Sequence, residues 1–182
     1  PGQKWIKRTI LEMGGKDCVA VDAGVDLDYA AQEAVASAFG FQGQKCSAGS
    51  RLILHESLYD AVLERVVERV KKLTVGNTSL DNFYMGAVID KSAFKTISEY
   101  VEVGKAEGRL AAEGHRPESD GYFIPPTVIA DISPTARIAQ EEIFGPVLAV
   151  IKAKDIDDIL AIANGTDFGL TGALLSPKRE NL

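Results

Sequence analysis

One cysteine of this chain stands among residues that favour chemistry over packing. Cys46 follows Gly43 and Lys45 in a polar segment, after an apolar run that ends at Phe39. A free cysteine is usually buried, and a single cysteine without a located activating group is weak evidence for a reactive thiol. A neighbouring cation and nearby backbone N–H groups nevertheless favour the thiolate, which is the form that attacks electrophiles. We therefore interpret Cys46 as a candidate nucleophile on a glycine-containing loop.

A carboxylate precedes two glycines earlier in the chain. Glu12 follows an apolar pair and stands just before Gly14 and Gly15. Glycines let another group approach the backbone closely, and the apolar approach predicts a short strand that ends at a cleft. Beside an apolar wall, Glu12 is a candidate general base. The alternative is a solvated carboxylate at the start of a loop.

Three motifs resemble those of the aldehyde dehydrogenase family. Segment 11–16 (LEMGGK) resembles the family's glutamate motif, and segment 43–48 (GQKCSA) resembles its cysteine motif, in the same order and at a fitting separation. Segment 140–147 (QEEIFGPV) resembles the motif whose glutamate and phenylalanine contact a nicotinamide cofactor. The similarity continues through segment 164–171 (NGTDFGLT) and covers essentially the whole chain.

The resemblance implies oxidation of an aldehyde to a carboxylate through a cysteine thioester, with NAD as the cofactor and NADP left open. Cys46 would be the nucleophile, and Glu12 would activate the water that hydrolyses the thioester. Family members that pass the acyl group to coenzyme A lack a glutamate at this position, so water is the expected acceptor.

The cofactor contacts are also implied by the resemblance. Glu142 would hold the ribose next to the nicotinamide, and Phe144 would pack near that end. Met13 and Gly14 belong to the same expected cofactor site. Without the surrounding motif, Glu142 would be interpreted as a surface carboxylate. Phe168 stands where the family usually has tyrosine, and we expect this difference not to touch the chemistry.

Two longer phrases, 39–48 (FGFQGQKCSA) and 100–108 (YVEVGKAEG), resemble most the 1-pyrroline-5-carboxylate dehydrogenase subfamily. Those enzymes oxidise glutamate semialdehyde to glutamate in proline or arginine catabolism. Their serine after the nucleophile helps to hold the substrate's carboxylate, so Ser47 is the candidate substrate-binding residue. A hydroxyl that pairs with loop backbone explains Ser47 equally well. A broader-specificity aldehyde dehydrogenase and a non-catalytic domain are the alternatives.

Family members are much longer than this chain. We expect residues 1–14 to be the end of the NAD-binding domain and residues 15–182 to be the catalytic domain, truncated at its C-terminus. The sequence contains neither a phosphate-binding glycine turn nor the family's oxyanion-hole asparagine. We therefore expect an excised catalytic domain that is inactive alone, from an enzyme that in full length is a homo-oligomer.

Composition excludes several other classes of protein. With 46% hydrophobic and 25% charged residues, 182 residues suffice for one sizeable core. A net charge of −6 disfavours nucleic acid as a partner, and no apolar run predicts a membrane span or a secretory signal. We expect a cytoplasmic protein with no disulfide between Cys18 and Cys46. His55 and His115 form no ligand-spaced cluster, so we expect no metal.

Strands and helices alternate along the chain. This order predicts an α/β fold with an open, mostly parallel sheet flanked by helices. The expected strands are 18–21, 51–55, 109–112, 123–124, 127–130 and 147–152. The expected helices are 26–39, 57–73, 91–107, 156–164 and a last one around 179–182.

Overall fold

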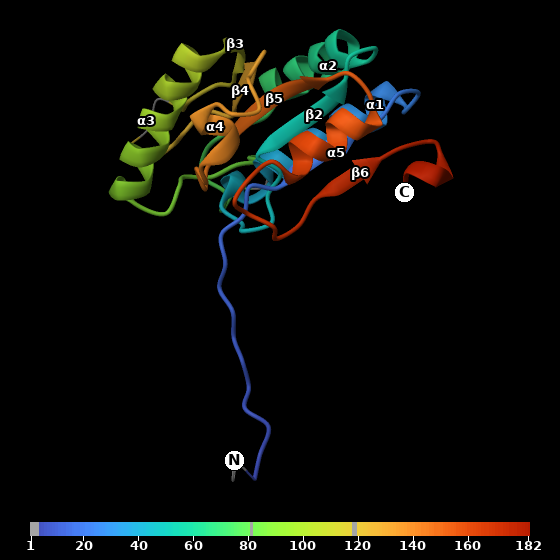
Figure 1. The fold of residues 1–182 in the computed structure, drawn as a ribbon. Coiled ribbons are helices and arrows are strands. Elements are labelled where there is room, and N and C mark those ends of the chain that lie inside the picture. Colours follow the sequence, from blue (N-terminus) through green and yellow to red (C-terminus); the bar gives the residue numbers. More distant parts are fainter. Residues whose placement is uncertain (1–3, 81, 118–119) are drawn as a thin grey trace.

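One six-stranded sheet forms the centre of the computed structural model, which describes residues 4–80, 82–117 and 120–182 (Figure 1). The spatial order is β3-β4-β5-β2-β1-β6, and every neighbouring pair is parallel except β3 with β4. The predicted α/β fold with a mostly parallel sheet is therefore confirmed. The strands are β1 (Cys18–Val21), β2 (Arg51–His55), β3 (Arg109–Glu113), β4 (Thr127–Ala130), β5 (Val147–Ala153) and β6 (Ala173–Leu175).

Helices cover both faces of this sheet, because successive strand residues point to opposite sides. On one face α1 and α2 pack against Leu52, Leu54 and Val150, and on the other α3, α4 and α5 pack against Ile53 and Ile151. The helices are α1 (Leu27–Phe39), α2 (Tyr59–Lys71), α3 (Lys91–Glu107), α4 (Arg137–Gln140) and α5 (Ile156–Asn164), with short 3₁₀ helices η1 (Gly40–Gly43) and η2 (Arg179–Asn181).

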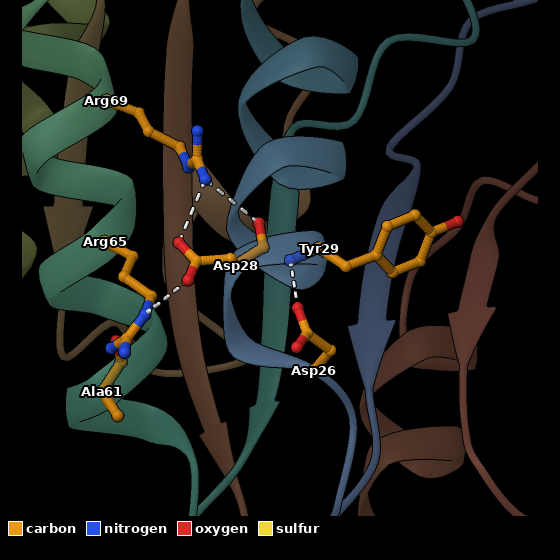
Figure 2. Close-up of polar contacts among 6 residues, drawn as sticks. All are labelled: Asp26, Asp28, Tyr29, Ala61, Arg65 and Arg69. Carbon is orange, nitrogen blue, oxygen red and sulfur yellow. Dashed lines mark hydrogen bonds and ion pairs between the residues drawn. The ribbon is translucent and has the colours of Figure 1, made fainter.

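The start of α1 is fixed by polar contacts, and α1 leads into the cysteine segment. The carboxylate of Asp26 caps the helix by accepting a hydrogen bond of 2.8 Å from the N–H of Tyr29 (Figure 2). Asp28 in the first turn pairs with Arg69 of α2 at 3.1 Å and with Arg65 at 3.6 Å. These exposed ion pairs contribute little to stability, but they join the two helices that cover one face.

Some sequence-based expectations about elements are wrong, and two elements were missed. Phe123 and Ile124 are buried but form no strand, because the two prolines that follow have no N–H for a ladder. The last expected helix is a single 3₁₀ turn. The short strand β6 at one edge of the sheet and the four-residue α4 were not predicted, since neither has a clear hydrophobic period.

Residues 4–14 leave the folded body as an extended segment (Figure 1). The strand expected before Glu12 is also wrong: no described residue pairs with this segment, and the side chains of Ile10 and Leu11 are 86% and 69% exposed. The chain enters the body at Gly15, which is buried. Of the described helices, none has both the length and the apolar character needed to cross a bilayer.

Candidate functional site

Cys46 lies on a short turn directly after η1, the 3₁₀ helix that follows α1. The N–H of Ala48 donates to the carbonyl of Lys45 at 3.0 Å, which places Cys46 and Ser47 at the two central positions of the turn. Both central residues are exposed. Residues 44–48 are called the cysteine loop below. The loop presents the thiol and the neighbouring hydroxyl to solvent, in contrast to the buried thiol of Cys18.

The ammonium of Lys45 does not pair with the thiol. Its nitrogen lies close to Gly40 at the start of η1, and in the described part of the chain no hydrogen bond or ion pair joins it to Cys46. The geometry therefore gives no direct support to Lys45 as the activating cation.

The cysteine loop lies against the turn that carries Glu142 and Phe144. Gly43 has φ +65° and its backbone contacts Gly145 so closely that a Cβ would collide with that residue's carbonyl oxygen. Phe144 also has a positive φ, of 55°, and its ring is 45% exposed. Only glycine at position 43 permits this approach of the two segments.

The two glycines after Glu12 touch both of these segments. The N–H of Gly15 donates to Oε1 of Glu142 at 2.9 Å. A Cβ on Gly15 would lie 2.5 Å from the carbonyl oxygen of Cys46, and one on Gly14 would lie 2.7 Å from Oε2 of Glu142. The structure thus brings Gly14, Glu142 and Cys46 together, although 127 positions separate Gly15 from Glu142.

Glu12 and Met13 lie on the segment that leaves the body. Both are exposed, and no apolar wall covers Glu12 among the residues that the structure describes. Glu12 is three residues from Gly15, and three extended residues span at most about 11 Å. Because Gly15 contacts the backbone of Cys46, the carboxylate lies within reach of the cysteine loop by movement of this segment alone.

A buried lysine lies immediately behind the two glycines, and the sequence did not single it out. The side chain of Lys16 is 2% exposed, and within the described chain its Nζ has no hydrogen-bond partner. Burial, and after it the charge of Arg51, lower the pKa of Lys16 to about 7, although the charge of Glu142 opposes the shift. Arg51 itself is well paired, since it donates to the carbonyls of Lys16, Ile162 and Ala163 at 2.9 Å each.

The loop that contains Phe168 is closer to the site than we expected. Asp17 accepts a hydrogen bond of 2.9 Å from the N–H of Thr171, which holds this loop against β1. The ring of Phe168 lies 3.2 Å from the place that a Cβ on Gly14 would take. The ring of Phe168 therefore lies in the space next to Glu142. The sequence did not predict this proximity, because Phe168 is far from Gly14 along the chain.

Two side chains of the site are free to contact a ligand. Among the described residues Oε2 of Glu142 accepts no hydrogen bond, so this carboxylate keeps acceptors for ribose hydroxyls. The exposed ring of Phe144 offers a face for a planar heterocycle. The described residues contain no group of histidine, cysteine or acidic side chains that could hold a metal ion.

Comparison with known proteins identifies the family of this chain. The family model described as the aldehyde dehydrogenase family matches residues 2–182. The chain is 59% identical over 182 residues to a 1-pyrroline-5-carboxylate dehydrogenase of Geobacillus sp. (strain WCH70) and 54% identical to one of Bacillus subtilis (strain 168). Each match covers 100% of this chain and 35% of the relative, so the chain spans about a third of their length.

Solved structures show the same similarity. The chain superposes on a 1-pyrroline-5-carboxylate dehydrogenase from Thermus with bound NAD with a TM-score of 0.91 and 52% identity, over 100% of this chain and 35% of that one. A betaine aldehyde dehydrogenase from Staphylococcus aureus in complex with NAD+ gives a TM-score of 0.88 and 35% identity, over 93% of this chain and 35% of that one. This chain belongs to the aldehyde dehydrogenase family.

Proposed function

We propose that this chain supplies the thiol nucleophile and the general base of an NAD-dependent enzyme that oxidises glutamate semialdehyde, the open form of 1-pyrroline-5-carboxylate, to glutamate. The observation that carries the proposal is the meeting of three segments at Gly15, which bonds Glu142 and contacts the backbone of Cys46. The names of the relatives at 54–59% identity support the choice of substrate.

The first step is a covalent capture of the aldehyde. The thiolate of Cys46 attacks the carbonyl carbon, a C–S bond forms, and the carbonyl electron pair moves to the oxygen. The backbone N–H of Cys46 is close enough to its own side chain to stabilise this oxyanion. The exposed turn leaves room for a small aldehyde at the sulfur.

When bound, NAD supplies the hydride acceptor, and loss of hydride to it leaves a thioester on Cys46. Glu142 and Phe144 would hold the ribose and nicotinamide end of the cofactor beside the sulfur. Gly14 lies beside Glu142, and we propose that the neighbouring Met13 contacts the same end of the cofactor. The common role of these cofactor-binding residues is to hold the nicotinamide at the distance that hydride transfer from the captured carbon requires.

Hydrolysis then frees the enzyme. Glu12 takes a proton from a water molecule, the water oxygen attacks the thioester carbon, and the C–S bond breaks. The products are the thiolate of Cys46 and the carboxylic acid, which loses its proton to solvent to give the carboxylate, and Glu12 then returns the proton that it took to solvent. Because Glu12 stands on the segment outside the body, we propose that this segment folds back over the cysteine loop in the complete enzyme, as its short distance from Gly15 permits.

A chimaera tests the proposal without assumptions about the rest of the protein. The matching 35% of the Geobacillus relative is replaced by these 182 residues, and NADH formation from glutamate semialdehyde is measured beside the unmodified relative. We expect activity in the chimaera and its loss in Cys46→Ser. An active Cys46→Ser chimaera, or a folded chimaera that is inactive while the relative turns over, would refute the proposal.

A Ser47 variant distinguishes an enzyme specific for glutamate semialdehyde from an aldehyde dehydrogenase of broader specificity. The hydroxyl of Ser47 is exposed next to Cys46, so it can donate to the carboxylate of glutamate semialdehyde. In the chimaera, Ser47→Ala should reduce kcat/KM for glutamate semialdehyde by about 10- to 150-fold, since a hydrogen bond to a charged group is worth about 1.5 to 3 kcal/mol and each 1.4 kcal/mol is a factor of ten. The kcat/KM for simple aliphatic aldehydes should stay unchanged. If Ser47→Ala leaves the ratio of the kcat/KM values for the two kinds of substrate unchanged, an aldehyde dehydrogenase of broader specificity is favoured.

A further inference from the structure

The cysteine loop is tied to a distant segment by one side chain. Oε1 of Gln44 accepts a hydrogen bond of 2.9 Å from the N–H of Ile89, which is 45 positions away. Because the partner is an N–H, only the oxygen of the amide can make this bond. Among the described residues of the cysteine loop, Gln44 is the one whose side chain bonds the backbone of another part of the fold.

The segment that donates this hydrogen bond is itself held by backbone hydrogen bonds. Met85 is fully buried, and its backbone bonds Thr74 and Gly76 at 3.0 and 2.9 Å. Val88 is 3% exposed, and its N–H donates to the carbonyl of Tyr122 at 2.9 Å. Residues 85–89, called the anchor segment below, are thus held to the body at Met85 and Val88, just before α3, while the side chain of Ile89 is 79% exposed. The hydrogen bond between Ile89 and Gln44 therefore ties the cysteine loop to a segment that is held to the body.

A second glutamine supports the same arrangement. When the amide of Gln42 is oriented so that both ends are paired, its oxygen accepts from the N–H of Gly86 at 2.7 Å and its nitrogen donates to the carbonyl of Phe41 at 3.2 Å. Phe41 and Gln42 both have positive φ, of 55° and 58°, which is unfavourable for residues with a Cβ. The contact with the anchor segment compensates for this strained entry to the cysteine loop.

We propose that Gln44 is a positioning residue that holds Cys46 in one orientation by bonding the anchor segment. The proposal rests on the proposed function, in which Cys46 is the nucleophile. It adds that the position of the sulfur depends on an amide oxygen two residues earlier. Reacting groups must be held to within fractions of an ångström, so loss of this bond spreads the thiol over several positions.

The test uses this chain with Cys46 alkylated by a trifluoroacetone reagent, so that fluorine NMR reports the position of the loop. Mass spectrometry confirms that the buried Cys18 is unlabelled. Gln44→Met removes the acceptor at similar size, Gln44→Glu keeps an acceptor, and the exposed Gln32→Met is the matched control. Exchange of the Ile89 amide with D₂O is measured in parallel.

We expect one narrow resonance in the parent chain, in Gln44→Glu and in Gln32→Met. In Gln44→Met we expect a broadened or split resonance and exchange of the Ile89 amide about three to ten times faster, as loss of one hydrogen bond implies. A single parent-like resonance in Gln44→Met would overturn the proposal. So would a Gln44→Glu spectrum as disturbed as that of Gln44→Met, because the acceptor would then not be the cause.

Should Gln44→Met fail to fold, Gln44→Asn takes its place, since asparagine is equally polar but one methylene too short to reach Ile89. A parent-like resonance in that variant would also overturn the proposal. These measurements need neither aldehyde nor cofactor. Failure of the proposed function in the chimaera is therefore distinguishable from failure of this inference.

Discussion

At the scale of single residues, Lys16 is the least expected feature of the site. Its amine is enclosed without a hydrogen-bond partner among the described residues, close enough to Arg51 and Glu142 to feel both charges. Burial without a partner disfavours the ammonium form, which is why the pKa of Lys16 falls to about 7. The residue therefore destabilises the fold whenever it is protonated.

The sign of this effect predicts a pH dependence. The pKa of an unfolded lysine is about 10.4, so between pH 7 and that value the unfolded chain binds more protons, and stability rises with pH. Lys16→Met should raise the free energy of unfolding by a few kcal/mol at pH 6, because each unit of pKa shift is worth about 1.4 kcal/mol. At pH 9.5 the increase should be much smaller, because the buried amine is then neutral in the folded chain. Urea unfolding at the two pH values measures this difference, with the exposed Lys95→Met as control. A Lys16→Met chain that is less stable at both pH values would contradict this account of Lys16.

At the scale of elements, the site depends on the contact between the cysteine loop and the turn of Glu142. Gly43 makes that contact possible through its positive φ and its lack of a Cβ. The same contact sets the spacing between the thiol and the groups that we propose for cofactor binding. A side chain at this position would force the two segments apart.

Gly43→Ala should therefore lower the free energy of unfolding by more than about 2 kcal/mol, since left-handed backbone alone costs about 1 to 2 kcal/mol and a backbone clash is added. Gly169→Ala is the matched control, because a Cβ there meets nothing within 4 Å. We expect a change of less than about 1 kcal/mol in the control. Equal urea midpoints for the two variants would show that the close contact between Gly43 and Gly145 is absent in solution.

At the scale of the whole molecule, residues 4–14 and the body behave as two parts. The body buries its apolar side chains on both faces of the sheet, whereas Trp5, Ile6 and Ile10 are 82–100% exposed on the extended segment. The segment makes the chain a body with one projecting arm (Figure 1). This arrangement agrees with a domain boundary near residue 14, which stays a prediction.

Limited proteolysis tests this division. Trypsin should cleave first after Lys7 or Arg8, because proteases act on extended, unpaired backbone, and the body should persist as one fragment. The cut also releases Trp5, the one tryptophan of the chain, so the large fragment should lose tryptophan fluorescence. Cleavage within α2 or α3 at the same rate would contradict a stable body.

Local patterns predicted most elements of this fold but not the contacts between them. The buried strand 18–21 and residues 147–151 of β5 are continuous apolar runs, and Gly108 and Gly165 follow the ends of two helices as expected. Phe123 and Ile124 also look like a strand, but the prolines after them decide otherwise. Hydrophobic periodicity reports which elements form, and it carries no information on which loops meet.

The site shows the same limit. The motifs identified Gly14, Cys46 and Glu142, and the fold brings them together. Nothing local marks Lys16 as buried, because its environment is built by Arg51 and by the carbonyls of α5 that Arg51 holds. The bond from Gln44 to Ile89 is equally hidden, since an isolated glutamine is most often a surface residue.

The most direct test of the central claim is to isolate the covalent intermediate. The chimaera with Glu12→Gln is mixed with glutamate semialdehyde and NAD, quenched in acid, digested and analysed by mass spectrometry. If Cys46 forms the thioester and Glu12 activates the water, removal of the base slows hydrolysis by about 10² to 10⁴ and the acyl group accumulates. We expect a glutamyl thioester on the peptide that contains Cys46. An unmodified Cys46 in a variant that still reduces NAD, or an acyl group on another residue, would contradict it.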